Sequence, residues 1–357
     1  LVSTIATGAA SAKGTMNGAL ATRYSVDIVA MGDDISQQMV KDVADINGVS
    51  DTLYAPAVSV TLEKADGTQP TSALLVGVKN IDQVKQVMRA NLGNASIDSD
   101  SVLMPTYNAQ TGKELQFANG TADFSTEWNQ DGDATRSLTL QANQADYRRV
   151  SAQYEAVGFV DESHFTNGDL DAATHVLLVK ADTDKSGVSV DGIYNDMQAA
   201  LEKSTDATVT GPIAERIVWA KMIDSMMMLL VGLIAVAVLI ALVGVANTLS
   251  LSVIERTRES ATLRAIGMTR GQLRASLAIE ALLISLVSGI AGILLGTLFG
   301  WLGAYVVFSM YGKVVFPFEW GINGIVLAVA AVAALLASVF PARRAVSTPP
   351  VEALAEA

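Results

Sequence analysis

Three long uncharged runs dominate the second half of the chain. No charged side chain occurs between residues 226 and 254 or between residues 281 and 308, and a third apolar run covers residues 321–340. A helix needs about 20 apolar residues to cross the ~30 Å hydrocarbon core of a bilayer. The pattern therefore predicts a membrane α-helical part with three C-terminal transmembrane helices, the second extending over 275–311 with its flanks.

The first run is longer than a membrane crossing requires. Its 29 residues would extend about 43 Å as a helix. Residues 214–225 (AERIVWAKMIDS) precede it with helix-forming side chains and with neither proline nor glycine. We therefore predict one continuous stalk and transmembrane helix over 214–254, which joins an N-terminal domain to the membrane part.

The residues before the stalk show shorter patterns. Residues 24–30 (YSVDIVA) alternate between polar and apolar side chains as a strand does, whereas residues 36–46 have the apolar spacing of an amphipathic helix. Residues 114–142 are polar and favour β-structure. This mixture predicts an α+β domain over 24–213 that contains a β-rich insertion.

Charge divides the chain in the same way. Residues 1–215 carry a net charge of −15 and residues 216–357 carry +3, within a total of −12. Such asymmetry is typical of two different environments. An acidic domain also argues against nucleic acid as a partner, because nucleic-acid binding depends on clustered lysine and arginine.

Arginine gives the orientation of the predicted spans. The loop 255–274 contains five arginines, whereas the loop 309–320 contains one lysine and the tail 341–357 begins with an arginine pair. Short loops rich in lysine and arginine stay in the cytoplasm. We expect a multi-pass protein of a bacterial cell membrane with a cytoplasmic 341–357 tail and with residues 1–215 extracytoplasmic.

An extracytoplasmic N-terminal domain needs a route across the membrane. Residues 1–12 are weakly apolar, too short to span, and lack the basic start of a signal peptide. We therefore expect residues 1–23 to be the outer end of a truncated transmembrane helix, with one span upstream missing. The alternative is a soluble N-terminus that is exported with the first complete span.

Catalytic and metal-binding patterns are absent from the sequence. There is no cysteine and there are only two histidines, and no nucleophile elbow, zinc-protease or phosphate-loop motif occurs. The aspartates at 98, 100, 131 and 133 do not continue into a calcium loop and suit solvated loops better. We expect no catalytic residue, no metal and no cofactor in this chain.

Small residues recur in the second apolar run. Gly292, Gly296 and Gly300 are spaced four apart, which places them on one helix face where another helix can pack closely. The partner of that face does not follow from the sequence. Glu280 stands near the predicted membrane interface, and a buried proton-relay carboxylate is the less favoured alternative.

The C-terminal 136 residues resemble the FtsX-like ABC transporter permease family, which includes macrolide-exporter and lipoprotein-release permeases. The resemblance depends on the combination of VANTLSLSVIERTRESATLRAIGMTRGQL (245–273), LAIEALLISLVSGIAGILLG (277–296) and PARRAVSTPPVEAL (341–354). Residues 1–215 match by position and size only. The motifs resemble those in the C-terminal half of a long two-unit permease. A four-span permease that pairs as a homodimer remains an alternative.

The resemblance implies a cytoplasmic coupling helix within 255–274 that contacts a partner ATPase. Arginines can also pair with carboxylates on such a partner, and two apolar side chains can anchor the contact. The alternative is that these arginines only enforce the topology. The implied contact residues are Glu255, Arg256, Arg258, Glu259, Leu263, Arg264, Ile266 and Gly267.

Function follows as an expectation. The chain resembles a non-catalytic permease subunit in which a separate cytoplasmic ABC ATPase dimer, holding ATP and Mg, drives movement of the extracytoplasmic domain. That movement would export a substrate or extract it from the membrane or outer space. The alternative is a signal transmitter that regulates a cell-wall hydrolase or senses antimicrobial peptides. The expected partners are the ATPase, a second permease unit, an extracytoplasmic protein and membrane lipid.

Overall fold

The computed structural model describes residues 1–63, 70–126, 136–183, 185–255 and 267–347. The chain forms two compact units. The helical unit combines Leu1–Met16 with Ala220–Ala357, and the domain unit covers Asn17–Trp219. Most of the 255–274 loop, including the segment 256–266, therefore lies outside the described residues.

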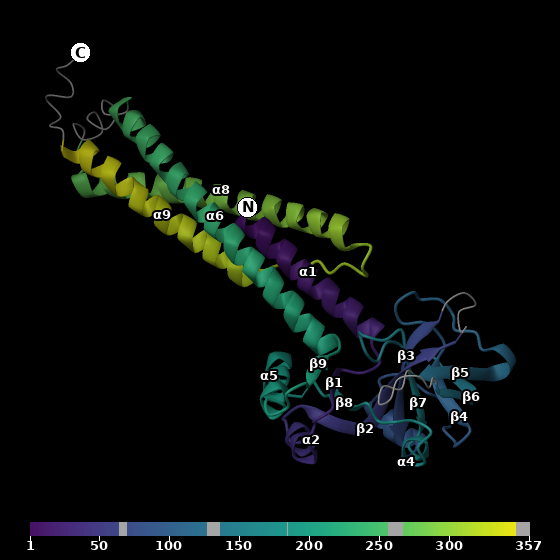
Figure 1. The fold of residues 1–357 in the computed structure, drawn as a ribbon. Helices are drawn as coiled ribbons and strands as arrows, with labels where there is room; N and C mark the ends of the chain where they lie inside the picture. The colour runs from purple at the N-terminus through teal and green to yellow at the C-terminus, as the bar shows by residue number, and fades with distance from the viewer. Residues whose placement is uncertain (64–69, 127–135, 184, 256–266, 348–357) are drawn as a thin grey trace. The chain divides into compact units, whose positions relative to one another are not determined.

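Among the described residues of the domain unit (Figure 1), one mixed sheet contains nine strands in the order β3-β7-β4-β6-β5-β2-β8-β1-β9. A further pairing between β3 and β2 closes β2, β3, β7, β4, β6 and β5 into a ring. The strands are β1 (Ile28–Gly32), β2 (Val49–Leu62), β3 (Thr71–Val78), β4 (Ser101–Pro105), β5 (Thr121–Thr126), β6 (Arg136–Ala145), β7 (Ala156–Asp161), β8 (Thr174–Ala181) and β9 (Thr208–Thr210).

The long strand β2 belongs to both parts of this sheet. Its first half pairs with β8, as in Leu53↔Leu178, and its second half pairs with β3, as in Val60↔Ala73. The polar region predicted over 114–142 supplies β5 and most of β6. These strands pair with β2 and β4 in the same sheet, so the predicted insertion is an integral part of the ring.

Helices cover the open part of the sheet. Helices α2 (Gln37–Ala44) and α5 (Val190–Ala200) pack against β1 and β8 in one apolar cluster, which includes Ile28, Leu177 and Met197. Helix α3 (Ile81–Val87) adds Val84 and Val87 to a second cluster. Each of these three helices starts at a side chain that accepts a backbone N–H: Ser36, Ser189 and Asn80. The short helix α4 (Ser163–Thr166) and a 3-10 turn (Ala118–Gly120) complete the domain.

The long helices described in the helical unit are α1 (Val2–Arg23), α6 (Pro212–Glu255), α8 (Arg270–Phe308) and α9 (Trp320–Ser347). Within the described residues, two segments are long and apolar enough to cross a membrane, Pro212–Ile240 and Gly271–Phe308. The apolar part of α9, Trp320–Leu336, is shorter than this test requires. The third predicted span therefore remains a prediction.

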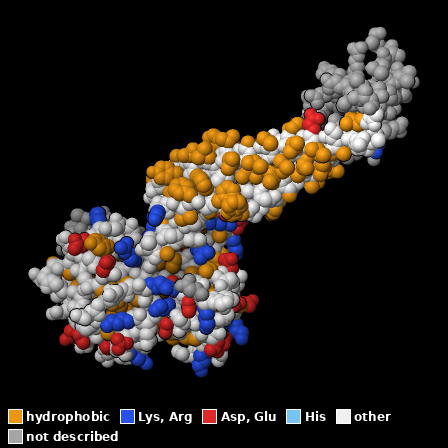
Figure 2. All heavy atoms as spheres, turned by 180° about the vertical axis from the view of Figure 1, so that it is seen from behind, with side chains coloured by type: hydrophobic (Ala, Val, Ile, Leu, Met, Phe, Trp, Pro, Cys, Tyr) orange, Lys and Arg blue, Asp and Glu red, His pale blue; other side chains and the backbone are white. Residues whose placement is uncertain are grey.

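Apolar side chains cover the outside of the helical unit (Figure 2). Leu239 and Ile240 in α6 are 63% and 69% exposed, and Val306 in α8 is 76% exposed. Helices α8 and α9 pack against each other, and the Ser285 hydroxyl donates to the Ala330 carbonyl at 3.0 Å. The Trp301 indole of α8 donates at 2.8 Å to the carbonyl of Pro317, which lies just before α9. A helix surface of this kind is stable only against lipid or other apolar helices.

Candidate functional site

The residues that connect α1 to β1 and β9 to α6 form a dense polar junction inside the domain unit. Tyr24, at the end of α1, is 4% exposed, and its hydroxyl donates a hydrogen bond to the carboxylate of Glu215 in the first turn of α6. The guanidinium of Arg149 lies 5.6 Å from the centre of the Tyr24 ring. Burial, followed by the bond to Glu215, raises the pKa of Tyr24 to about 12, so its hydroxyl remains a donor at neutral pH.

The segment 148–149 holds Ser25, the residue that follows Tyr24, by backbone and side-chain hydrogen bonds. The Ser25 amide donates to the Arg149 carbonyl at 3.0 Å, and the Ser25 hydroxyl accepts from the Arg148 amide at 2.6 Å. The Arg149 amide in turn donates to the Arg23 carbonyl at 3.1 Å. The chain that leaves α1 therefore pairs with the 148–149 segment as a short strand would.

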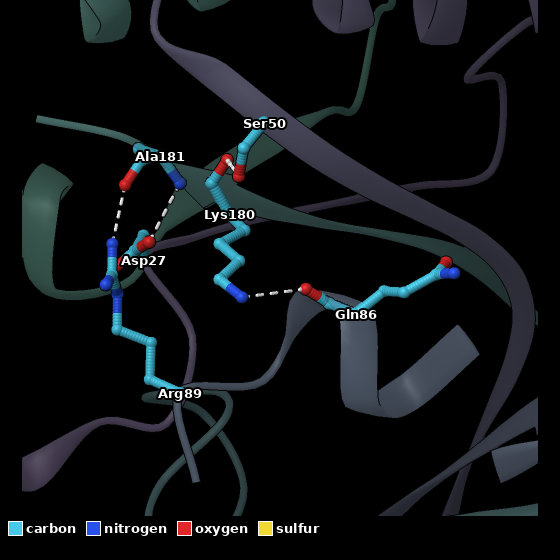
Figure 3. Close-up of polar contacts among 6 residues, drawn as sticks. All are labelled: Asp27, Ser50, Gln86, Arg89, Lys180 and Ala181. Carbon is cyan, nitrogen blue, oxygen red and sulfur yellow. Dashed lines mark hydrogen bonds and ion pairs between the residues drawn. The ribbon is translucent and has the colours of Figure 1, made fainter. Parts of the chain in front are cut away.

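Arg89 also forms hydrogen bonds to the segment between α1 and β1 (Figure 3). Its side chain donates to the Asp27 carboxylate at 2.6 Å and to the Ala181 carbonyl at 2.5 Å, while its amide donates to the Ser25 carbonyl at 2.7 Å. The second carboxylate oxygen of Asp27 accepts from the Ala181 amide at 2.8 Å. Both oxygens of this largely buried carboxylate thus accept a hydrogen bond, and Arg89 supplies the opposite charge that a buried carboxylate requires.

The start of α6 is attached to the same residue. The Ile213 amide donates to the Asp27 carbonyl at 3.3 Å. Gly211, between β9 and α6, has a φ of +104°, and a Cβ there would lie 3.1 Å from the Asp27 carbonyl oxygen. Only glycine fits this turn, because a side chain would be strained in φ and would press on the backbone.

An open cavity of about 550 Å³ lies beside this junction. Arg89, Lys180 and Arg216 contribute basic groups to its walls, and Leu20 and Ile213 are among its apolar lining residues. The Lys180 ammonium donates to the Gln86 carbonyl at 3.2 Å (Figure 3). No group of three or more potential metal-ligating side chains occurs among the described residues. The hydrogen bonds of the junction hold the end of α1 and the start of α6 together within the domain unit.

The predicted ATPase-contact residues are only partly described. Arg256, Arg258, Glu259, Leu263, Arg264 and Ile266 lie outside the described residues. Glu255 is the last residue of α6, and Gly267 lies in a turn with a φ of +111°. Shortly after that turn, the Thr269 hydroxyl accepts from the Gln272 amide and so caps the start of α8. The role of the eight predicted residues in an ATPase contact stays a prediction.

The three predicted packing glycines differ in their surroundings. A Cβ on Gly296 would lie 3.0 Å from Ser3 Cβ, and one on Gly300 would lie 2.8 Å from the Thr4 carbonyl oxygen. A Cβ on Gly292 would meet nothing within 4 Å among the described residues. The structure thus places α1 against α8 at two of the three positions. Glu280 is exposed on α8.

Two features of the helical unit were not predicted from the sequence. The Lys13 ammonium lies 2.5 Å from the Asp224 carboxylate and pairs α1 with α6. Ser3, Thr7 and Ser11 recur every four residues on α1 and are at most 4% exposed. In the domain, the junction residues are equally invisible to motif analysis, because their partners are far apart in the chain.

Comparison with known proteins identifies the C-terminal part. Residues 231–350 match the FtsX-like permease C-terminal family. These residues form an FtsX-like permease domain, the kind of domain found in ABC transporter permeases.

Curated relatives agree with this family. An uncharacterized ABC transporter permease of Methanocaldococcus jannaschii is 28% identical over 178 residues, which cover 48% of this chain and 44% of the relative. The macrolide export ATP-binding/permease protein MacB of Bordetella avium is 37% identical over 131 residues, covering 36% and 19%. The pyoverdine export ATP-binding/permease protein PvdT of Pseudomonas savastanoi pv. phaseolicola is 25% identical over 221 residues, covering 56% and 33%. The matches thus span less than half the length of these relatives.

Two solved structures resemble parts of the chain weakly. The periplasmic region of MacB from Actinobacillus actinomycetemcomitans aligns at 10% identity with a TM-score of 0.29, over 55% of this chain and 94% of that one. The extracellular domain of the noncanonic ABC-type transporter YknZ aligns at 10% identity with a TM-score of 0.27, over 52% and 100%. Similarity at this level carries no argument about the domain unit.

Proposed function

We propose that this chain is the permease subunit of an ABC transporter that transmits force from a cytoplasmic ATPase to its domain unit. The junction at Tyr24–Asp27 carries the proposal. It fixes the first turn of α6, through Glu215 and Ile213, to the segment that leads into β1, while Arg89, Arg148 and Arg149 fix the end of α1. Within the domain unit, both helix ends are thus held by hydrogen bonds close to the start of β1.

The shape of α6 supports the same mechanism. The helix continues from Pro212 to Glu255 and contains no proline after its first residue. Because a helix transmits displacement along its axis only while its backbone bonds are continuous, such an element suits a stalk. Its last residue, Glu255, adjoins the segment that the family resemblance assigns to the ATPase contact. ATP and Mg would be held by that partner subunit.

The remaining parts of the proposal follow from this mechanism. We place the protein in a bacterial cell membrane, with the domain unit outside the cytoplasm and the 255–274 loop inside. The ATPase acts as a dimer, so a second permease unit is required, in the same long chain or as a second copy. The exported or extracted substrate would be moved by the domain unit.

A stiffness test distinguishes this mechanism from a passive linker. Inserting Gly-Gly-Gly after Ser225 breaks the helical continuity of α6, whereas inserting Ala-Ala-Ala at the same point adds equal length and rotation but preserves it. We expect the glycine insertion to abolish transport while ATP hydrolysis continues, and the alanine insertion to retain more of it. Full transport by the glycine variant in proteoliposomes would overturn the mechanism.

A second test addresses the ATPase contact. Leu263→Asp combined with Arg264→Glu removes the proposed apolar anchor and inverts one charge. We expect ATPase co-purification and substrate-stimulated ATP hydrolysis to fall, while membrane insertion is unchanged. Normal co-purification would mean that these residues serve only the topology.

A further inference from the structure

Strand β9 leaves an open edge on the sheet of the domain unit. It pairs with β1 through Val29↔Thr210, Ala30↔Val209 and Met31↔Thr208, and within the described part of the chain no other strand pairs with it. Proteins normally protect such edges by keeping the edge strand very short or with lysine, proline or a bulge, and β9, with three residues, is short. The sequence Thr-Val-Thr carries neither lysine nor proline and strongly favours β-structure.

A groove follows this edge. Two adjoining hollows of about 420 and 200 Å³ share Val209 as a lining residue, and their lining also includes Tyr194 and Gln198 of α5 and Leu201, the residue after it. Tyr194 and Gln198 are four residues apart and so lie on one face of α5. We call the two hollows together the β9 groove.

One end of the β9 groove is apolar. The smaller hollow is lined by Val218 and Trp219 at the start of α6, together with Ala152 and Ala214. Val218 is 61% exposed and Trp219 is 42% exposed. Exposed tryptophans beside a pocket are typical anchor points for a partner side chain.

Charge decides between possible occupants. The charged residues that line the β9 groove are Glu202 and Glu215, both acidic, and residues 1–215 carry a net charge of −15. Glu215 is already bonded to Tyr24, which leaves Glu202 as the carboxylate facing the larger hollow. A second copy of this chain would bring like charge to the groove, whereas a basic segment would be attracted.

We propose that the β9 groove binds an extended, lysine- or arginine-bearing segment of a separate extracytoplasmic protein. The segment adds to the sheet as a strand beside β9, with its backbone supplying the hydrogen bonds that an open edge lacks. One apolar side chain occupies the hollow at Trp219, and a basic side chain lies near Glu202. The extracytoplasmic location of this partner rests on the proposed function, whereas strand addition to β9 does not depend on transport.

Defined peptide probes test this proposal on the full chain in lipid nanodiscs. The probe is a fluorescent eight-residue peptide of alternating valine and lysine, compared with its valine–glutamate counterpart and with N-methylated versions that block either backbone edge. We expect the lysine peptide to bind, the glutamate peptide to bind about tenfold more weakly, and one of the N-methylated peptides not to bind. No binding of the lysine peptide, or equal binding of all four peptides, overturns the proposal.

Matched variants locate the binding surface. Glu202→Lys should reverse the preference between the lysine and glutamate peptides, whereas Asp171→Lys, at an exposed carboxylate that lines neither hollow, should leave it unchanged. Because the chain has no native cysteine, a single cysteine at Thr208 reports on a second copy. Disulfide-linked dimers through that cysteine would assign the groove to a second copy and overturn the proposal. Peptide binding that appears only in lipid-free detergent would assign the groove to lipid and would also overturn it. Neither result bears on the stiffness of α6.

Discussion

The junction in the domain unit and the contact of α1 with α8 in the helical unit attach helices by different means. At the junction, Tyr24, Asp27 and Arg89 are joined to their neighbours by directed hydrogen bonds. In the helical unit, small residues bring backbones close together, as at Gly300 and Thr4. There the buried hydroxyls of Thr7, Ser11 and Thr297 and the Asn323 amide have no hydrogen-bond partner among the described residues, and at the junction the Nε of Arg149 also lacks one.

This contrast indicates that the two units tolerate different kinds of motion. A hydrogen-bonded junction holds one geometry, because leaving a buried polar group unpaired costs about 1–3 kcal/mol. A contact between small residues depends mainly on close packing, which is the usual basis of helix association in lipid. The junction is therefore the stiffer attachment, and the helical contact is the place where helices can adjust.

The turn at Gly211 should give the largest effect. Gly211→Ala forces a side chain into a φ of +104° and against the Asp27 carbonyl oxygen, which should cost about 3 kcal/mol of domain stability. Chemical unfolding of the purified full chain, followed by circular dichroism, measures this cost. Gly168→Ala is the control, since its φ of +81° gives backbone strain with nothing within 4 Å of the Cβ. Equal losses in the two variants would remove the argument for steric crowding.

Alanine substitutions at two of the packing glycines should change the stability of the helical unit by a smaller amount, and in different directions. Gly300→Ala places a Cβ 2.8 Å from the Thr4 carbonyl oxygen and should destabilise the helical unit by about 2 kcal/mol. Gly292→Ala meets nothing within 4 Å and should be neutral or slightly stabilising, because alanine favours the helix. Unfolding in mixed detergent micelles compares the two. The contact with α1 would be disproved by indistinguishable stabilities.

Removing one hydroxyl at the junction should have a modest effect on stability. Tyr24→Phe deletes the bond to Glu215 and should cost about 1–2 kcal/mol, with a matching loss of transport if the junction transmits force. Tyr107→Phe changes an exposed tyrosine and should change neither quantity. A Tyr24→Phe protein with reduced stability and normal transport would separate the junction's structural role from the proposed mechanical one.

Acid should weaken the domain unit slightly through Asp161. Hydrogen bonds from the Ser163 side chain and then from its backbone lower the pKa of Asp161. A carboxylate whose pKa is depressed on folding stabilises the protein above its unfolded pKa, near 4, and loses that contribution as the pH falls through the folded pKa. Below about pH 4 the wild type should therefore lose stability faster than Asp161→Asn. Identical acid titrations of the two, followed by tryptophan fluorescence, would contradict this assignment.

The helical elements were the most predictable part, since long uncharged runs have few alternatives. The sequence predicts a helix over 214–254, and α6 covers Pro212–Glu255. The third predicted span stays a prediction, because the described apolar part of α9 is shorter than the apolar segments of α6 and α8. For the sheet, alternation indicates single strands but not their order. The strand β2 changes neighbours near Ala57, and nothing in its local pattern marks that change.

The junction lay beyond sequence reasoning for a different reason. Asp27 and Arg89 are bonded across 62 positions, and Tyr24 and Glu215 across 191. Neither pair has helical spacing or belongs to a motif, and each residue alone is an ordinary surface type. The one local signal was Gly211 immediately before Pro212, which is typical of a turn into a helix. The ATPase-contact residues remain predictions from the family resemblance.

The strand order has a consequence for how the protein is made. Strand β1 is synthesised early, yet both of its neighbours, β8 and β9, come late in the chain. Until those strands are translated, Ile28–Gly32 has two unpaired edges and five buried-type positions without cover. The last of them, β9, ends at Thr210, directly before α6 begins. Completion of the domain and synthesis of the stalk are therefore consecutive events, and β1 keeps one unpaired edge until just before the stalk is made.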